Sequence, residues 1–159
     1  MNSTFAKALG IGIAAVAVIV GLILFMQKGA QVTLECQVKV RTLATSDVES
    51  LVIADLHLTN PASYPFIIRD ITVTLETDKG DMARVVAARS DAERFFASTP
   101  QSGPYHQAFF TKAPIAPGAT IDYTALAAFP IPEQMIKDGK RLRITIVEIE
   151  GKTFDFFDR

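Results

Sequence analysis

The sequence predicts a mainly β protein in which a single N-terminal transmembrane helix is followed by an antiparallel β-sandwich. Two observations support this: an uncharged apolar run near the N-terminus, and a series of short segments with alternating apolar and polar residues behind it. They divide the chain into residues 1–29, the tail and transmembrane helix, and residues 30–159, an extracytoplasmic sandwich domain.

The apolar run extends from Ala8 to Met26 and carries no charged side chain. As a helix it would be about 28 Å long, close to the hydrocarbon thickness of a bilayer. A cleaved signal peptide is the alternative, but its apolar core is usually shorter and is followed by small residues, whereas Gln27 and Lys28 follow here. We therefore expect a retained, single-pass signal anchor in a bacterial inner membrane, with the C-terminal domain in the periplasm or outside the cell.

Small side chains recur along one face of this predicted helix, at Ala6, Gly10, Ala14, Ala17 and Gly21. At 100° per residue they fall within an arc of about 80°. Such a face lets another membrane helix approach closely, which predicts integral membrane protein subunits and the lipid bilayer as partners. The alternative is chance, because alanine and glycine are common in membrane helices.

After Gly29 the chain changes to short runs of valine, isoleucine, leucine and threonine separated by turn residues, the pattern of β-strands. In the first run Cys36 lies on the apolar side, which predicts a small buried core residue. A capping-box pattern predicts a helix from Ser90 that ends before Pro100, and one helical turn is expected at 132–137. The predicted strands are 31–42, 51–60, 68–77, 82–88, 107–114, 119–129, 140–150 and 152–157.

Roughly seven or eight short strands in one domain predict an immunoglobulin-like sandwich. The stretch from Asp55 to Pro61, the strand 68–75 and the turn at Gly80 resemble late-embryogenesis-abundant (LEA14/WHy-like) domains. The turn at 115–118 and the strand 121–129 resemble membrane-anchored bacterial extracytoplasmic domains of similar fold. The resemblance covers roughly residues 48–150 and implies a binding, stress-related or accessory module, with no catalytic motif to carry over.

Composition argues against several classes of function. The 16 lysines and arginines nearly balance 17 acidic residues, so nucleic acid is not expected as a partner. One cysteine and two histidines are too few for a Cys/His zinc site, and Asp78 and Asp81 are too few for calcium. His57 and His106 are expected on the solvated surface. We therefore predict no metal, no cofactor and no enzymatic activity.

Two groups of side chains are candidates for contact with a partner. The first is aromatic: Phe95 and Phe96 in the long connection 89–104, and Phe157 near the C-terminus. Packing in the core is the alternative for these residues. The second is the basic cluster Lys137, Lys140, Arg141 and Arg143, which could face lipid headgroups or an acidic partner. A solvated strand edge that discourages aggregation explains it equally well.

Two functions follow from these observations. The first is a non-catalytic accessory subunit of a larger membrane protein complex, for example photosynthetic, respiratory or secretory, anchored by one helix. The alternative is a free-standing, membrane-tethered binding module for a protein or a small ligand.

Overall fold

The computed structural model describes residues 12, 13, 15–22, 33–99 and 106–158 of the chain. The chain divides into two compact units, Met1–Val32 and Thr33–Arg159. In the first unit, residues 12, 13 and 15–22 are helical and exposed.

The described part of the chain contains no helix that is long and apolar enough to cross a membrane. This finding contradicts the predicted transmembrane helix, the single-pass signal anchor and the predicted location in a bacterial inner membrane. Of the predicted packing face, Ala6, Gly10 and Ala14 lie outside the described residues, and Ala17 and Gly21 are exposed helical residues.

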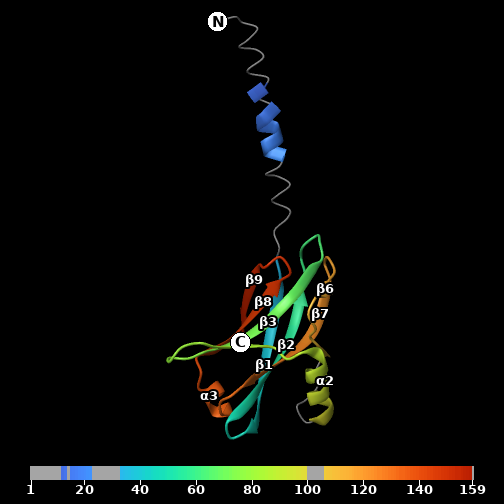
Figure 1. The fold of residues 1–159 in the computed structure, drawn as a ribbon. Coiled ribbons are helices and arrows are strands. Elements are labelled where there is room, and N and C mark those ends of the chain that lie inside the picture. The colour runs from blue at the N-terminus through green and yellow to red at the C-terminus, as the bar shows by residue number, and fades with distance from the viewer. Residues whose placement is uncertain (1–11, 14, 23–32, 100–105, 159) are drawn as a thin grey trace, which may run out of the picture. The chain divides into compact units, whose positions relative to one another are not determined.

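The second unit is mainly β, as predicted, and is built from two open sheets (Figure 1). Sheet A has the strand order β1 (Glu35–Ser46), β2 (Glu49–Thr59), β7 (Thr120–Phe129), β5 (Gln107–Ala108). Sheet B has the order β4 (Met82–Val85), β3 (Phe66–Glu76), β8 (Arg141–Glu148), β9 (Thr153–Phe157), with β6 (Ala113–Ile115) also paired to β3. The sheets are not wholly antiparallel, because β5 runs parallel to β7.

The core lies between the inner faces of the two sheets. Alternate residues of the four central strands point inward, because successive side chains of a strand face opposite sides. From β2, β7, β3 and β8 respectively, the buried inward residues are Val52, Ala54, Leu56, Leu58; Tyr123, Ala125, Ala127, Phe129; Ile71, Val73, Leu75; and Leu142, Ile144, Ile146.

A second, smaller cluster lies on the other face of sheet A. Helix α2 (Arg89–Ser98) packs Ala92 and Phe96 against Leu51 and Ile53 of β2, together with Ala108 and Leu126. Strand β2 is therefore buried on both faces where it begins, which explains its continuous apolar run. The predicted helix is present, but the capping box is not: Ala88 is the N-cap, without a side-chain cap hydrogen bond.

Asn60 joins the turn after β2 to the turn between β6 and β7. Its buried Nδ2 donates to the carbonyl oxygens of Tyr64 (2.9 Å), Ile115 (3.0 Å) and Ala116 (3.3 Å). Its Oδ1 accepts from the backbone N–H of Ala62 at 3.0 Å. The two turn signals seen separately in the sequence are thus one hydrogen-bonded unit.

Replacing Asn60 by alanine is expected to lower the free energy of unfolding by about 3 kcal/mol, because buried backbone groups would lose their partner. Urea unfolding followed by circular dichroism measures the change. Thr59→Ala is the matched control: among the described residues its exposed hydroxyl bonds only Thr120, so a loss below about 1 kcal/mol is expected. Equal stability of the two variants would contradict the role given to Asn60.

Candidate binding cleft

The chain crosses from sheet B to sheet A immediately after β4. The N–H of Val86 donates to Ile71 O of β3 at 3.2 Å, and the next N–H, of Ala87, donates to Leu126 O of β7 at 2.7 Å. Two successive residues are therefore bonded to different sheets. The segment then continues into α2, which begins two residues after Ala87. The hydrogen bond of Ala87 to β7 therefore also sets where α2 begins on sheet A.

The chain crosses back between β5 and β6. Phe109 N donates to Thr124 O of β7 at 3.0 Å, and Lys112 N donates to Ile68 O of β3 at 2.8 Å. Lys112 has φ 62°, a left-handed conformation that non-glycine residues rarely adopt. The single strand predicted at 107–114 is therefore wrong: this stretch is divided between the two sheets, with a tight turn between its parts.

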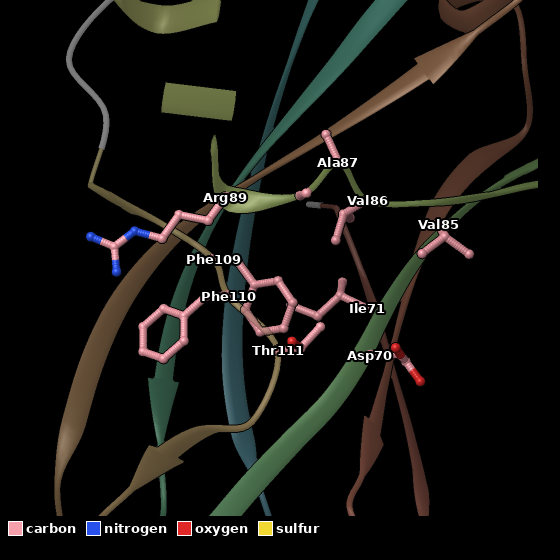
Figure 2. A pocket seen from close by; sticks show the side chains of 10 residues that line it. Asp70, Ile71, Val85, Val86, Ala87, Arg89, Phe109, Phe110 and Thr111 are labelled. Atoms are coloured by element: carbon pink, nitrogen blue, oxygen red, sulfur yellow. The ribbon is translucent and has the colours of Figure 1, made fainter. Parts of the chain in front are cut away.

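A cleft of about 280 Å³ lies between the two crossings, on the edge of β3 that β4 and β6 leave open (Figure 2). Figure 2 shows Phe109, Ile71 and Val86 at its centre, with Arg89 and Phe110 on one side and Val85 and Asp70 on the other. Its lining residues are Asp70, Ile71, Val85, Val86, Ala87, Ala88, Arg89, Phe109, Phe110 and Thr111.

Both charged side chains of the lining already have partners. Arg89 Nε lies 2.6 Å from Glu93 Oε1, and its guanidinium carbon lies 5.4 Å from the Phe110 ring centroid. Asp70 Oδ2 lies 3.0 Å from Arg69 Nε. Both ion pairs are substantially exposed and contribute little to stability. The cleft therefore offers a mainly apolar surface, whose polar side chains are the exposed Thr111 and the paired Asp70 and Arg89.

None of the lining residues was singled out from the sequence. A signal was nevertheless present in the consecutive aromatic pair Phe109 and Phe110, because large apolar side chains that are not fully buried often mark a binding surface. In the structure Phe109 is buried and Phe110 is half-buried. Each ring packs edge-on against Tyr123, with centroids 5.9 Å apart in both pairs.

The predicted aromatic contacts lie in three different environments. Phe96 is only 1% exposed and belongs to the cluster under α2, while Phe95 is half-buried beside it. Phe157 is 38% exposed and lies under the guanidinium of Arg141, 4.1 Å from its ring centroid. Core packing therefore accounts for Phe96, and of these three rings Phe157 is the most exposed.

The predicted basic cluster is neutralised by nearby carboxylates. Arg141 Nε lies 2.6 Å from Glu76 Oε2, and Arg143 Nη2 lies 3.1 Å from Asp81 Oδ2. Lys140 Nζ lies 2.7 Å from Asp78 Oδ1. Lys137 is paired with Glu133 of α3 (Glu133–Lys137). The sequence showed the cations together but not the acids that β3 and the following turn bring beside them.

Polar side chains also pair across the outer face of sheet A. His57 is exposed, as predicted, and its Nδ1 lies 2.6 Å from Asp122 Oδ1. Nearby, Asp55 Oδ2 lies 2.9 Å from Arg41 Nη2, and Asp55 Oδ1 accepts from Thr124 Oγ1 at 2.8 Å. These pairs join neighbouring strands, as on the solvated face of an antiparallel sheet. Across the described ranges, no group of three or more His, Cys, Asp or Glu side chains could hold a metal ion.

Comparisons with known proteins do not identify a family. No family model and no curated protein matches this chain. A crystal structure described as the ApaA protein from Bordetella pertussis has 17% identity and a TM-score of 0.41, covering 80% of this chain and 89% of that one. An X-ray structure of a structural-genomics target has 12% identity and a TM-score of 0.41, covering 79% and 82%. Similarity at this level supports no inference about the fold family or the function of this chain. The resemblance to LEA14/WHy-like domains stays a prediction.

The reactivity of the Cys36 thiol reports how well the inward face of β1 is buried. The thiol is half-buried, rather than fully buried as predicted, because β1 is an outer strand of sheet A. Burial raises the pKa of Cys36 from 9.0 to about 12. At pH 8.5 the native protein should therefore react with iodoacetamide several hundredfold or more slowly than the protein in concentrated urea.

Mass spectrometry of the alkylated chain measures both rates. The same pKa predicts that stability falls as the pH rises from about 9 towards 12, because the unfolded thiol loses its proton first. Equal alkylation rates in the native and unfolded protein would show that the inward face of β1 is open to solvent.

Proposed function

We propose that this chain is a non-catalytic binding module that takes an apolar side chain of a partner protein into the cleft between the two crossings. The observation that carries the proposal is an apolar cleft at an exposed edge, with Val85 at its rim 69% exposed. Exposed apolar side chains that gather at a concave site mark binding surfaces.

The size of the cleft favours a side chain over a free small molecule. Pockets for whole drug-sized ligands usually have volumes of roughly 300–1,000 Å³. This cleft, at about 280 Å³, lies just below that range and is partly open to solvent. One bulky apolar side chain fits it, with the rest of the partner lying across the rim.

The chemistry of the lining supports binding rather than catalysis. The described residues that line the cleft include no histidine, cysteine or serine, and their carboxylate and guanidinium are both in ion pairs. Nucleophilic catalysis needs a nucleophile and a base within hydrogen-bonding reach of each other. The partners predicted earlier, membrane subunits and lipid, depended on the transmembrane helix, so the proposal assigns partner recognition to the sandwich instead.

A phage-displayed library of random dodecapeptides, selected on the whole chain, tests this proposal. We expect the selected peptides to share a bulky apolar residue. Thr111→Trp, which places a large side chain at the exposed rim, should reduce their binding at least tenfold. Thr153→Trp on β9 is the control, because Thr153 is exposed and is not part of the lining.

Urea unfolding of both variants confirms that they fold equally well. Selection of peptides without a shared apolar residue, or equal binding by Thr111→Trp and the wild type, would contradict the proposed function.

A further inference from the structure

Strand β4 presents an open edge beside the cleft. It is the outer strand of sheet B, and it pairs with β3 in a register that sets Thr72 opposite Val85. Continuing this register places Val86 opposite Ile71, and these two residues are hydrogen-bonded. Because bonded and non-bonded pairs alternate along an antiparallel ladder, Ala83 and Val85 must direct their backbone N–H and C=O groups away from β3.

A side-chain contact agrees with this assignment. Arg84 Nη1 donates to the carbonyl oxygen of Ala83 at 3.0 Å, as an outward-facing carbonyl permits. Strand β4 contains no proline, so each of its residues keeps a backbone N–H group for pairing. Its last residue, Val85, belongs to the cleft lining, so the open edge and the cleft are continuous.

The charges around the cleft favour an acidic partner. Of the four cations in and beside the lining, Arg69 and Arg89 are paired with Asp70 and Glu93. In the part of the chain that the structure describes, Arg84 and Lys112 form no ion pair. They follow Ala83 and Thr111 directly, at the two ends of the open edge of β3. Arg84 precedes the lining residue Val85 and Lys112 follows the lining residue Thr111, so two cations outside the described ion pairs flank the lining along the chain.

We propose that the partner is an extended, acidic peptide segment that adds a strand to the open edge of β4 and places an apolar side chain in the cleft. Backbone hydrogen bonds to Ala83 and Val85 would supply affinity, and the cleft would select the side chain, as in other complexes formed by strand addition. This inference rests on the proposed function, which requires only that the cleft take an apolar side chain.

Synthetic versions of a peptide selected on the whole chain test the strand pairing without changing the protein. An added strand uses the N–H groups of every second residue for the ladder. Two peptides are therefore compared, one N-methylated at its odd-numbered residues and the other at its even-numbered residues. One of them should bind at least tenfold more weakly than the unmethylated peptide, and the other should lose much less affinity. Equal losses in the two frames would overturn the strand-pairing inference.

Variants of the edge supply a second test. Ala83→Pro removes an outward N–H and leaves the ladder to β3 intact, so it should weaken binding about tenfold, whereas Ala83→Thr should not. Lys112→Glu should weaken binding of the acidic peptide roughly fivefold. Lys79→Glu is its control, since Lys79 lies in the exposed turn between β3 and β4 and undergoes the same change of charge.

The outcomes separate the two proposals. Peptides that share an apolar residue but show no excess of aspartate and glutamate, or that bind Ala83→Pro as tightly as the wild type, would overturn the inference and leave the proposed function standing. Peptides without a shared apolar residue would overturn both. Acidic, apolar peptides that lose binding on Ala83→Pro and Lys112→Glu would support both.

Discussion

Four backbone hydrogen bonds join the two sheets along one side of the sandwich, at the two segments where the chain crosses between them. Val86 and Lys112 are bonded to β3 in sheet B, and Ala87 and Phe109 are bonded to β7 in sheet A. Each crossing is thus fixed at both ends, and the sheets cannot separate along this side without breaking these bonds. The cleft is the space that remains between two fixed segments, so its walls are formed by the same constraint that joins the sheets.

The other side of the sandwich is closed by side chains. Asp158 Oδ1 accepts from the N–H of Val40 at 3.1 Å, which connects the end of sheet B to the outer strand β1. Thr42 Oγ1 donates to Glu133 Oε1 of α3 at 2.6 Å. This bond, and then that of Lys137, lowers the pKa of Glu133 because both favour the ionised carboxylate. One side of the domain is therefore filled, and the other keeps an open edge and a cleft.

Periodicity in the sequence predicted the strands well because it records burial directly. Short apolar runs predicted strand ranges close to those of β2, β3, β7 and β8, and glycine or proline turns marked several of their ends. The prediction failed at residues 107–115, where β5 and β6 are too short to show a period and belong to different sheets. Phe109, Phe110 and Thr111 of the cleft lining belong to this stretch, and the other lining residues come from β3 and from the stretch 85–89, which only the fold brings beside them.

The pairing of the basic cluster with acidic side chains could not be predicted from the sequence either. Glu76 and Asp81 lie far along the chain from Arg141 and Arg143, and only the register of β3 with β8 brings them together. The same limit applied to His57, whose partner Asp122 comes from β7.

Chemical-shift mapping with N-acetylphenylalaninamide, a single capped apolar side chain, tests the central claim most directly. We predict that the amide signals of residues 70, 71, 85–89 and 109–111 move together in a saturable titration, and that the outer face of sheet A is unaffected. Shifts confined to another surface, or small non-saturable shifts throughout the domain, would contradict the assignment of the cleft as a binding site.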